Sequence, residues 1–340
     1  MSSGERFLVT GALGCIGAWT VRSLAKEGTP VVAFDKTTDP RRLRDISTPE
    51  QYASVSVING DITDLAAVES ALDEHDITHV IHLAALQVPA CRANPPLGAL
   101  VNVVGTVNVF EAVRRRAQRI RQLVYTGSMG MFGPDDGDPL TGMLEPDASP
   151  HPGNHYAVYK QANENNARIF WAEHGVSSIS LRPMTVYGPG RDFGVTSTPT
   201  KAIAAAVSGR PYTISFGGGT LFQFADDVGR TLLSAARSGL TGARVYNMGG
   251  IYSTIRDFVS AIEREVPESR GMIDVVDQPL PFPDRISDRG LEEIGVAPVT
   301  PLATGIHITA DFFRDQIARG VFSAEKHGLE PQEPATTLAI

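Results

Sequence analysis

The sequence predicts an α/β protein with a doubly wound parallel sheet and a smaller C-terminal lobe. Apolar runs alternate with helical patterns from Arg6 to Pro183, as a parallel sheet with crossover helices requires. After Pro183 this rhythm breaks, because residues 188–200 are rich in glycine, proline and threonine and residues 278–284 hold three prolines. Such segments are typical of loops over a substrate cleft rather than of a core.

Seven apolar runs predict the strands of the sheet, and they fall at residues 6–10, 30–34, 55–58, 79–83, 122–126, 177–182 and 244–248. Helical patterns separate several of these runs and fall at residues 14–27, 64–74, 98–117 and 155–173. Because parallel crossovers are right-handed, we expect helices on both faces of the sheet. With 340 residues, 42% of them hydrophobic, the chain can bury a large core.

The first predicted strand leads directly into a glycine turn. The run from Phe7 to Thr10 is followed by Gly11, Gly14 and Gly17 and then by a helical pattern. Glycine leaves room for a pyrophosphate, and the start of a helix offers unpaired N–H groups and a positive dipole end to the phosphates. The pattern therefore indicates a bound dinucleotide. Its spacing differs from G-x-G-x-x-G, and close packing of helix on strand is the alternative explanation.

A second motif, Tyr156-x-x-x-Lys160, stands at the start of the last helical pattern. Residues four apart on a helix share a face, so the phenol and the ammonium can reach one reaction centre. An ordinary exposed pair on a helix is the alternative. The strand at 122–126 ends in Gly127-Ser128, which places a hydroxyl at a carboxyl end, where open parallel sheets bind their ligands. The three side chains are therefore candidates for proton transfer in one cleft.

With these motifs the chain resembles the extended short-chain dehydrogenase/reductase family, the group of NAD-dependent epimerases, dehydratases and dehydrogenases. The resemblance covers roughly residues 5–320, and its carriers are Thr10 to Gly17, Asp35, Asp61-Ile62, His82 to Ala85, Asn102, Gly105-Thr106, Ser128, Tyr156, Lys160, Arg182-Pro183 and Val186 to Gly190. It implies a Rossmann-type NAD-binding domain of residues 4–184 plus about 221–250. The substrate-binding lobe would be residues 185–220 plus 251–325, and we expect a flexible tail over 328–340.

The resemblance also implies which residues contact the ligands. Cofactor contacts are expected at Gly11, Gly14, Cys15, Ile16, Gly17, Asp35, Asp61, Ile62, Leu83, Ala84, Ala85, Tyr156, Lys160 and Pro183. Substrate contacts are expected at Gln87, Ser128, Met129, Thr185 and Arg191. The Asp35 carboxylate would accept hydrogen bonds from the adenosine ribose and repel a 2′-phosphate, which favours NAD over NADP. A helix-capping aspartate is the alternative, and Lys36, Arg41 and Arg42 could host a phosphate.

The resemblance makes Tyr156 the general base. A free phenol has a pKa of about 10, so lowering it by about three units takes roughly 4 kcal/mol of preferential stabilisation of the phenolate. Lys160 and the positive nicotinamide are expected to supply that charge. Ser128 would hold the substrate oxygen, and Asn102 would help to position the lysine, unless it is a helix-surface amide. These residues together would oxidise a secondary alcohol with transfer of hydride to NAD.

Departures from the family pattern bear on the net reaction. Met129-Gly130 stands where sugar-nucleotide 4,6-dehydratases carry an Asp-Glu pair, which argues against dehydration. Thr220 and Leu221 stand where nucleotide-sugar epimerases carry Arg-Asp. These epimerases carry a further arginine in a later segment, and residues 279–283, which include three prolines, occupy that segment here. Thr185 replaces a common asparagine on the substrate side. Because bidentate arginines hold diphosphates strongly, we expect nucleotide sugars to bind poorly.

We therefore predict an NAD-dependent oxidoreductase acting on a small polyhydroxylated or carboxylated alcohol, such as a free sugar or sugar acid. The alternative is a sugar or nucleotide-sugar epimerase similar to UDP-glucose 4-epimerase, with Arg285 or Arg191 substituting for the missing arginines. A non-catalytic NAD sensor is a third hypothesis. The presence of Ser128, Tyr156 and Lys160 disfavours it.

Composition and charge bear on partners and location. A net charge of −8 and a pI near 5.5 give no electrostatic reason to bind nucleic acid or an anionic membrane. We find no apolar run long enough to span a bilayer, no signal peptide and no disulfide framework, so we expect the cytoplasm. We expect no metal site, with His82 a satisfied core histidine. The family's common dimer, a bundle of the helices near 98–117 and 155–173, predicts a homodimer.

Overall fold

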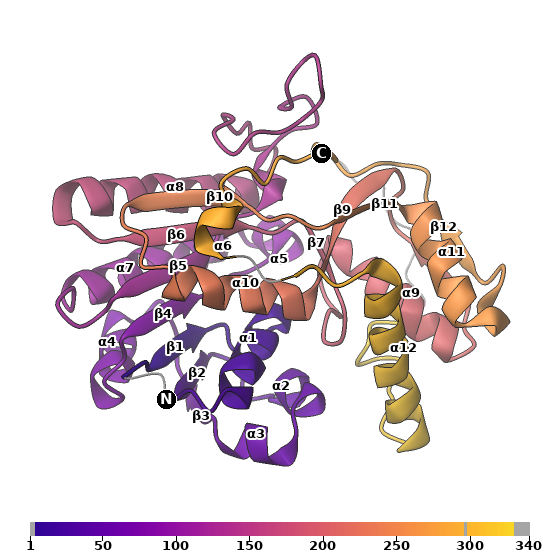
Figure 1. The fold of residues 1–340 in the computed structure, drawn as a ribbon, viewed down its shortest axis with the longest axis horizontal. Coiled ribbons are helices and arrows are strands. Elements are labelled where there is room, and N and C mark those ends of the chain that lie inside the picture. Colours follow the sequence, from indigo (N-terminus) through magenta and orange to yellow (C-terminus); the bar gives the residue numbers. More distant parts are fainter. Residues whose placement is uncertain (1–3, 296–297, 330–340) are drawn as a thin grey trace.

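A seven-stranded sheet forms the centre of the computed structural model, which describes residues 4–295 and 298–329. Every strand is parallel to its neighbours, in the order β10-β6-β5-β4-β1-β2-β3 (Figure 1). The strands are β1 (Phe7–Thr10), β2 (Val31–Asp35), β3 (Ser56–Asn59), β4 (His79–His82), β5 (Gln122–Thr126), β6 (Ser178–Arg182) and β10 (Ala243–Asn247). The predicted doubly wound parallel sheet is confirmed. Its order reverses between β1 and β4, so the crevice at their carboxyl ends is the expected ligand site.

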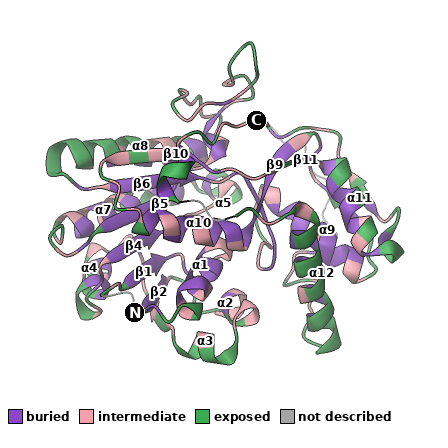
Figure 2. Ribbon diagram, viewed as in Figure 1, coloured by how far each residue is buried: buried purple, intermediate pink, exposed green. Residues whose placement is uncertain are grey.

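Helices cover both faces of this sheet. They are α1 (Cys15–Lys26), α2 (Arg41–Ile46), α3 (Pro49–Ala53), α4 (Leu65–Glu74), α5 (Val88–Ala93), α6 (Pro95–Ala99), the π-helical turn η1 (Leu100–Val104), α7 (Gly105–Arg114), α8 (His155–His174) and α10 (Ala225–Arg237). Successive residues of β1 face opposite sides, so Val9 lies in the core beneath α1 and α10 and Leu8 in the core beneath α4 and α7. Figure 2 shows the central strands buried between these layers.

The predicted helix over 98–117 is divided into α6, η1 and α7. The stretch Pro95–Arg114 is long and apolar enough by composition to cross a bilayer, so the expectation that no such run exists is wrong. The stretch is apolar on two sides, one of which packs in the core while the other is exposed. Phe110 packs in the core, whereas Leu97, Leu100 and Val104 are exposed.

Among the described residues, the lobe after Pro183 has two small sheets, three α-helices and three short 3-10 helices, at the right of Figure 1. One sheet has the order β11-β9-β7 and the other β12-β8, and the elements are β7 (Thr185–Tyr187), η3 (Val195–Ser197), α9 (Thr198–Val207), β8 (Tyr212–Ile214), β9 (Gly219–Phe224), β11 (Ile251–Thr254), α11 (Ile255–Glu265), η4 (Pro267–Ser269), β12 (Ile273–Val275), η5 (Leu291–Ile294) and α12 (Leu302–Ala318). The predicted boundary near 221 falls inside β9, and α10 and β10 then return the chain to the main sheet.

The lobe and the main domain share one hydrophobic core. Trp19 of α1 lies 5.7 Å from Phe224, and Phe224 lies 5.5 Å from Tyr187, as measured between ring centres. Tyr187 in turn contacts Phe258 of α11 at 5.6 Å. These ring contacts run from α1 into the lobe, so the two parts pack on each other through one continuous core.

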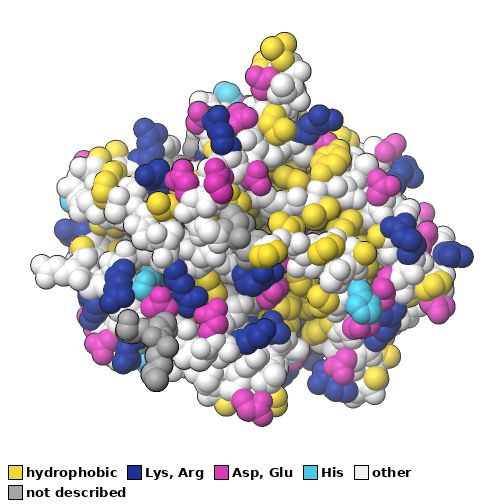
Figure 3. Space-filling model, viewed as in Figure 1, with side chains coloured by type: hydrophobic (Ala, Val, Ile, Leu, Met, Phe, Trp, Pro, Cys, Tyr) yellow, Lys and Arg dark blue, Asp and Glu magenta, His cyan; other side chains and the backbone are white. Residues whose placement is uncertain are grey.

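The surface carries both signs of charge, and acidic and basic side chains are interspersed over the face in Figure 3. Arg116, for example, pairs with Asp73 at 2.6 Å. At the end of the described chain Leu329 is buried and donates its N–H to the carbonyl of Ala324 at 2.8 Å. The remainder of the predicted tail, 330–340, lies outside the described residues.

Candidate active site

The glycine turn between β1 and α1 has the shape of a phosphate cradle. Gly11 has a φ of 68°, and a Cβ there would lie 2.5 Å from the backbone nitrogen of Ala84, so only glycine permits this close approach. The helix α1 begins at Cys15, and Gly14 before it offers no side-chain cap to the first N–H groups. Those donors and the positive helix end are available to a pyrophosphate. Burial raises the pKa of the Cys15 thiol to about 11, which keeps it a neutral filler.

Asp35 ends β2 at the edge of this cradle. Its Oδ2 accepts the N–H of Leu13 at 2.8 Å, and its Oδ1 accepts the N–H of Thr37 at 3.0 Å. These bonds hold the carboxylate beside the glycine turn. Its remaining lone pairs suit the hydroxyls of an adenosine ribose.

The basic side chains that could host a 2′-phosphate already have acidic partners. The ion pairs are Lys36 with Asp61 at 2.6 Å, Arg41 with Asp39 at 3.3 Å and Arg42 with Asp192 at 2.6 Å. A phosphate would have to displace those carboxylates. This geometry fits NAD better than NADP.

The other predicted cofactor residues follow the ends of strands in the same crevice. Leu83 donates its N–H to the carbonyl of Thr10 at 3.0 Å, which places the segment with Ala84 and Ala85 beside the glycine turn. Ile62 follows β3, and its carbonyl accepts from Asn108 Nδ2 at 3.0 Å. At the far side of the sheet, the carbonyl of Pro183 accepts the N–H of Met129 at 3.2 Å.

Ser128, Tyr156 and Lys160 lie together at the carboxyl end of β5. Asn154 caps α8 by accepting the N–H of Ala157 at 3.1 Å, which fixes Tyr156 in the first turn of the helix. Lys160 Nζ lies 5.7 Å from the centre of the Tyr156 ring and donates to the carbonyl of Thr126 at 2.6 Å. The structure thus brings the three predicted side chains to one place.

The charges around Tyr156 decide how readily it gives up a proton. Burial raises its pKa, whereas a hydrogen bond with Ser128 and the positive charge of Arg191 oppose that rise. Burial lowers the pKa of Lys160 to about 8, and the negative charge of Glu164 opposes that fall. Arg191 is therefore a source of positive charge that the sequence analysis did not assign to the phenolate.

Asn102 lies in the π-helical turn η1 and is fully buried. Its Oδ1 accepts the N–H of Leu86 at 2.7 Å, and its Nδ2 donates to the carbonyl of Leu86 at 2.9 Å. Asn163 of α8 donates to the backbone carbonyl of Asn102 at 2.9 Å. Asn102 therefore links the segment before α5 to α8, and the alternative of a helix-surface amide is wrong.

A buried ion pair behind the site was missed by the sequence analysis. Glu164, one turn after Lys160, pairs with Arg182 of β6 at 2.7 Å, and both side chains are less than 10% exposed. Arg182 also donates to Asn247 Oδ1 at 3.2 Å. The Arg182-Pro183 motif was the sequence signal for this pair. The sequence analysis noted the motif as a mark of the family but did not assign a counter-ion to Arg182. The pair ties α8 to the sheet one helical turn from Lys160.

The predicted substrate residues differ in their environments. Gln87 precedes α5, and Met129 is buried in the short helix η2 (Met129–Met131). Thr185 is fully buried, and its hydroxyl lies 2.8 Å from that of Thr220. Arg285, which was considered as a diphosphate ligand, is exposed.

Residues 188–194, here called the strap, cross from β7 towards the glycine turn. Trp19 Nε1 donates to the carbonyl of Pro189 at 3.0 Å. Arg42 donates to Asp192 through Nε at 3.2 Å and through Nη2 at 2.6 Å, and its Nη1 donates to the carbonyl of Leu13 at 3.3 Å. Arg42 therefore fastens the strap to the turn that would hold the pyrophosphate.

His82 is a satisfied core histidine, as predicted. Its Nδ1 lies 2.6 Å from Thr10 Oγ1 and its Nε2 lies 3.0 Å from Thr106 Oγ1. Burial, together with the charge of Lys160, lowers its pKa to about 3, so the ring is neutral. This bonding leaves neither ring nitrogen free to bind a metal.

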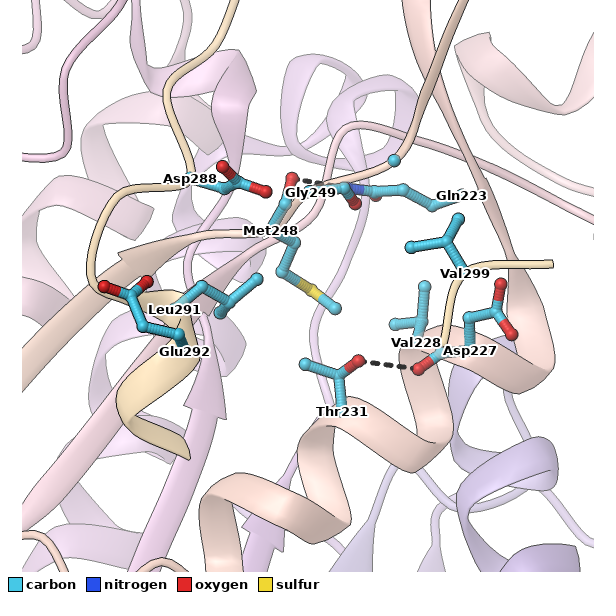
Figure 4. Close-up of a pocket in the computed structure, with 11 residues that line it drawn as sticks. Gln223, Asp227, Val228, Thr231, Met248, Gly249, Asp288, Leu291, Glu292 and Val299 are labelled. Carbon is cyan, nitrogen blue, oxygen red and sulfur yellow. Dashed lines mark hydrogen bonds between the residues drawn. The ribbon is translucent and has the colours of Figure 1, made fainter. Parts of the chain in front are cut away.

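Two further features lie away from these residues. A cavity of about 200 Å³ is lined by Gln223, Asp227, Val228, Thr231, Met248, Gly249, Gly250, Asp288, Leu291, Glu292 and Val299 (Figure 4). Its Asp227 is ion-paired with Arg230. Glu265, His307 and Asp311 form a group with metal-binding atoms close together on the lobe surface, but Arg314 bonds both carboxylates, at 2.7 and 2.8 Å.

The sheet, the phosphate cradle, the carboxylate of Asp35 and the Ser128, Tyr156 and Lys160 group define an NAD-dependent enzyme of the short-chain dehydrogenase/reductase type. The model of the NAD dependent epimerase/dehydratase family matches residues 7–249. The chain belongs to that family.

Known relatives agree with this assignment along nearly the whole chain. UDP-glucose 4-epimerase of Mycolicibacterium smegmatis is 31% identical over 329 residues, which are 92% of this chain and 99% of the relative. UDP-glucuronate 4-epimerase 2 of Arabidopsis thaliana is 29% identical over 89% of this chain and 74% of the relative. The structure of Thermus thermophilus UDP-glucose 4-epimerase with NAD superimposes with a TM-score of 0.77 at 27% identity, covering 91% of this chain and 99% of that chain. These relatives support the epimerase alternative better than the predicted dehydrogenase.

Proposed function

We propose that the protein is a 4-epimerase of a nucleotide-linked sugar that keeps its NAD throughout turnover. The observation that carries this proposal is the fastened strap. An epimerase must hold the reduced cofactor beside the ketone until the hydride returns, whereas a dehydrogenase must release NADH in every cycle. Arg42 and Trp19 tie the strap across the glycine turn, which favours retention of the cofactor. The 4-epimerase activities in the relatives' names support the same reaction.

The site residues divide the reaction among themselves. Tyr156 Oη takes the proton of the substrate 4-hydroxyl, and Ser128 donates a hydrogen bond to the oxygen as it becomes a carbonyl. Lys160 keeps a positive charge behind the phenolate from its anchor on Thr126. NAD, held by the N–H groups at the start of α1 and by Asp35, would supply the hydride acceptor for the oxidation and the hydride donor for the return. Tyr156 then gives its proton back, so only the configuration of one carbon changes.

A second candidate, a dehydrogenase of a small alcohol, is favoured by one observation in the lobe. Thr220 and Leu221, which stand where nucleotide-sugar epimerases carry Arg and Asp, are buried and uncharged. Thr220 is engaged with Thr185. Without an arginine there, a bound diphosphate would lose its hydration and gain few charge-assisted hydrogen bonds in exchange. A substrate without a nucleotide does not carry this cost.

We also propose a cytoplasmic homodimer. Exposed apolar side chains follow α6, η1 and α8, namely Leu97, Leu100, Val104, Val158 and Ile169. Val109 of α7 is buried in the core and does not belong to that surface. Both cysteines are free thiols, which suits a reducing compartment.

The test compares stereochemical change with release of NADH. The purified protein is incubated with added NAD and with UDP-glucose, UDP-glucuronate or the corresponding free sugars, and the products are followed by proton NMR and by NADH absorbance. We expect inversion of a nucleotide sugar with no NADH in solution. Stoichiometric NADH from a free sugar or sugar acid, without inversion, would establish the second candidate instead.

A further inference from the structure

Gly127 follows β5 between two residues of the site and has a carboxylate packed against it. The carbonyl of Thr126, just before it, accepts from Lys160 Nζ at 2.6 Å, and Ser128 comes just after it. A Cβ on Gly127 would overlap Glu164 Oε1, so only glycine leaves room for this carboxylate. The end of β5 that carries Thr126 and Ser128 therefore lies directly on Glu164.

This carboxylate is itself held by two residues of β6. Glu164 Oε1 accepts from Ser180 Oγ at 2.9 Å and from Arg182 Nε at 3.0 Å, and Glu164 Oε2 accepts from Arg182 Nη2 at 2.7 Å. Arg182 Nη1 also donates to the carbonyl of Pro146, between β5 and α8, at 2.9 Å. All three side chains of this network are buried. Charge-assisted bonds in a buried place are strong and directional, so the backbone at Gly127 has a rigid support.

The same carboxylate is the charge that faces Lys160. Glu164 follows Lys160 by four residues on α8, so the two buried side chains share a face of the helix. The other titratable neighbours of Lys160 are Tyr156, Cys91 of α5 and His82 of β4. Burial raises the pKa of the phenol and the thiol and lowers the pKa of the imidazole, so these three groups are neutral at neutral pH. In the described part of the chain, the negative charge beside the ammonium is therefore that of Glu164.

We infer that Glu164 is a positioning residue for proton transfer. Its carboxylate, held by Arg182, fixes the end of β5 that carries Thr126 and Ser128, and its charge holds the ammonium of Lys160 at that end. The effect on turnover rests on the proposed function. Ser128 must lie within hydrogen-bond reach of the substrate oxygen, and a small displacement of such a group lowers the rate of the chemical step.

The first measurement is the titration of Lys160 by NMR, which needs no substrate. The chain has five lysines, so a protein with an isotope label at the lysine ε-carbons gives few signals, and Lys160→Met identifies the signal of Lys160. In NAD-saturated protein we expect Glu164→Gln to move this titration to lower pH, because the ammonium loses its negative neighbour. Arg182→Gln removes the opposing positive charge and should move the titration to higher pH. Ser180→Ala, the matched control, keeps both charges and should leave the titration in place.

The second measurement separates turnover from cofactor binding. Gly127→Ala keeps both charges of the pair but directs a Cβ into the Glu164 carboxylate. We expect kcat for inversion of a nucleotide sugar to fall by a factor on the order of ten or more, with NAD affinity within about twofold of the wild type. Gly133→Ala is the matched control, because a Cβ there would meet nothing closer than 3.7 Å. Gly127→Ala leaves no buried charge without its counter-ion, so it provides the test if Glu164→Gln does not fold.

The outcomes separate positioning from a purely structural role. Opposite shifts of the Lys160 titration in Glu164→Gln and Arg182→Gln, together with a slow Gly127→Ala, support the inference. A titration that neither variant moves, or that both move in the same direction, would show that the pair only stabilises the fold. Normal kcat in Gly127→Ala would show that the carboxylate does not position Ser128. If the wild type inverts neither UDP-glucose nor UDP-glucuronate, the proposed function fails, whereas the titration still decides whether Glu164 holds the ammonium.

Discussion

The main domain and the lobe bury different kinds of polar group around the crevice. Behind α8 the domain buries charges, since Lys160 lies one turn before Glu164 and Glu164 pairs with Arg182. On the lobe side the buried contacts are neutral, with Thr185 and Thr220 paired through their hydroxyls at 2.8 Å. In the proposed reaction, buried charges on one side would serve proton transfer, while the neutral contacts of the lobe would leave it free to differ with the substrate. Arg191 is the charged exception, and it stands on the strap between the two parts.

The largest expected effect tests the charged side of this comparison. Glu164→Gln keeps the size of the side chain but leaves Arg182 buried without its counter-ion, so we expect a loss of about 3–5 kcal/mol of unfolding free energy. Thr185→Val is the matched change in the lobe. It should cost only about 1–2 kcal/mol, because it leaves one neutral hydroxyl unpaired. Urea unfolding of both variants measures the difference, and equal losses would remove the contrast between the two parts.

The domain was predictable because its signals are local. Alternating apolar runs placed all seven strands of the sheet, and the Gly11, Gly14 and Gly17 turn and the Tyr156 motif each lie within a few residues. The strands after Pro183 that form the lobe were not predicted. They are mostly short, β7 having only three residues, and they depend on pairing with segments distant in sequence.

The site was predictable as a set of residues but not as a set of interactions. Ser128, Tyr156 and Lys160 could be named from spacing. The pairing of Arg42 with Asp192 spans 150 positions in the sequence, and no local pattern indicates it. The same holds for the orientation of Arg191, because the course of the strap depends on how the lobe packs on α1.

The second effect concerns the reaction end, where the two parts meet. Tyr156→Phe removes the general base, so we expect turnover to fall by a factor on the order of 10² or more, with NAD binding nearly unchanged. Tyr159→Phe is the matched control on the same helix, since its hydroxyl donates to the carbonyl of Pro95 at 2.9 Å. Initial rates and NAD titrations of both variants decide the point. Near-normal turnover of Tyr156→Phe would contradict the assignment.

The smallest effect concerns the free energy that the protein spends on burying the charge of Lys160. Burial lowers the pKa of Lys160 from 10.5 to about 8. Below pH 8 the lysine is charged in both the folded and the unfolded protein, so the full cost of burying its charge is present. Between pH 8 and 10.5 the folded protein releases a proton that the unfolded chain retains, and stability rises with pH relative to a variant without the group. Lys160→Met removes this contribution.

We therefore expect the stability of Lys160→Met relative to the wild type to fall by about 2 kcal/mol between pH 7 and about pH 9.5. Urea midpoints of the two proteins at matched pH values give this difference, and other titrating groups cancel in it. A difference that stays flat over this range would mean that Lys160 keeps an ordinary pKa in the folded protein. The carbonyl of Thr126 and the charge of Glu164 would then offset its burial fully, and the charged side of the site would carry no such cost.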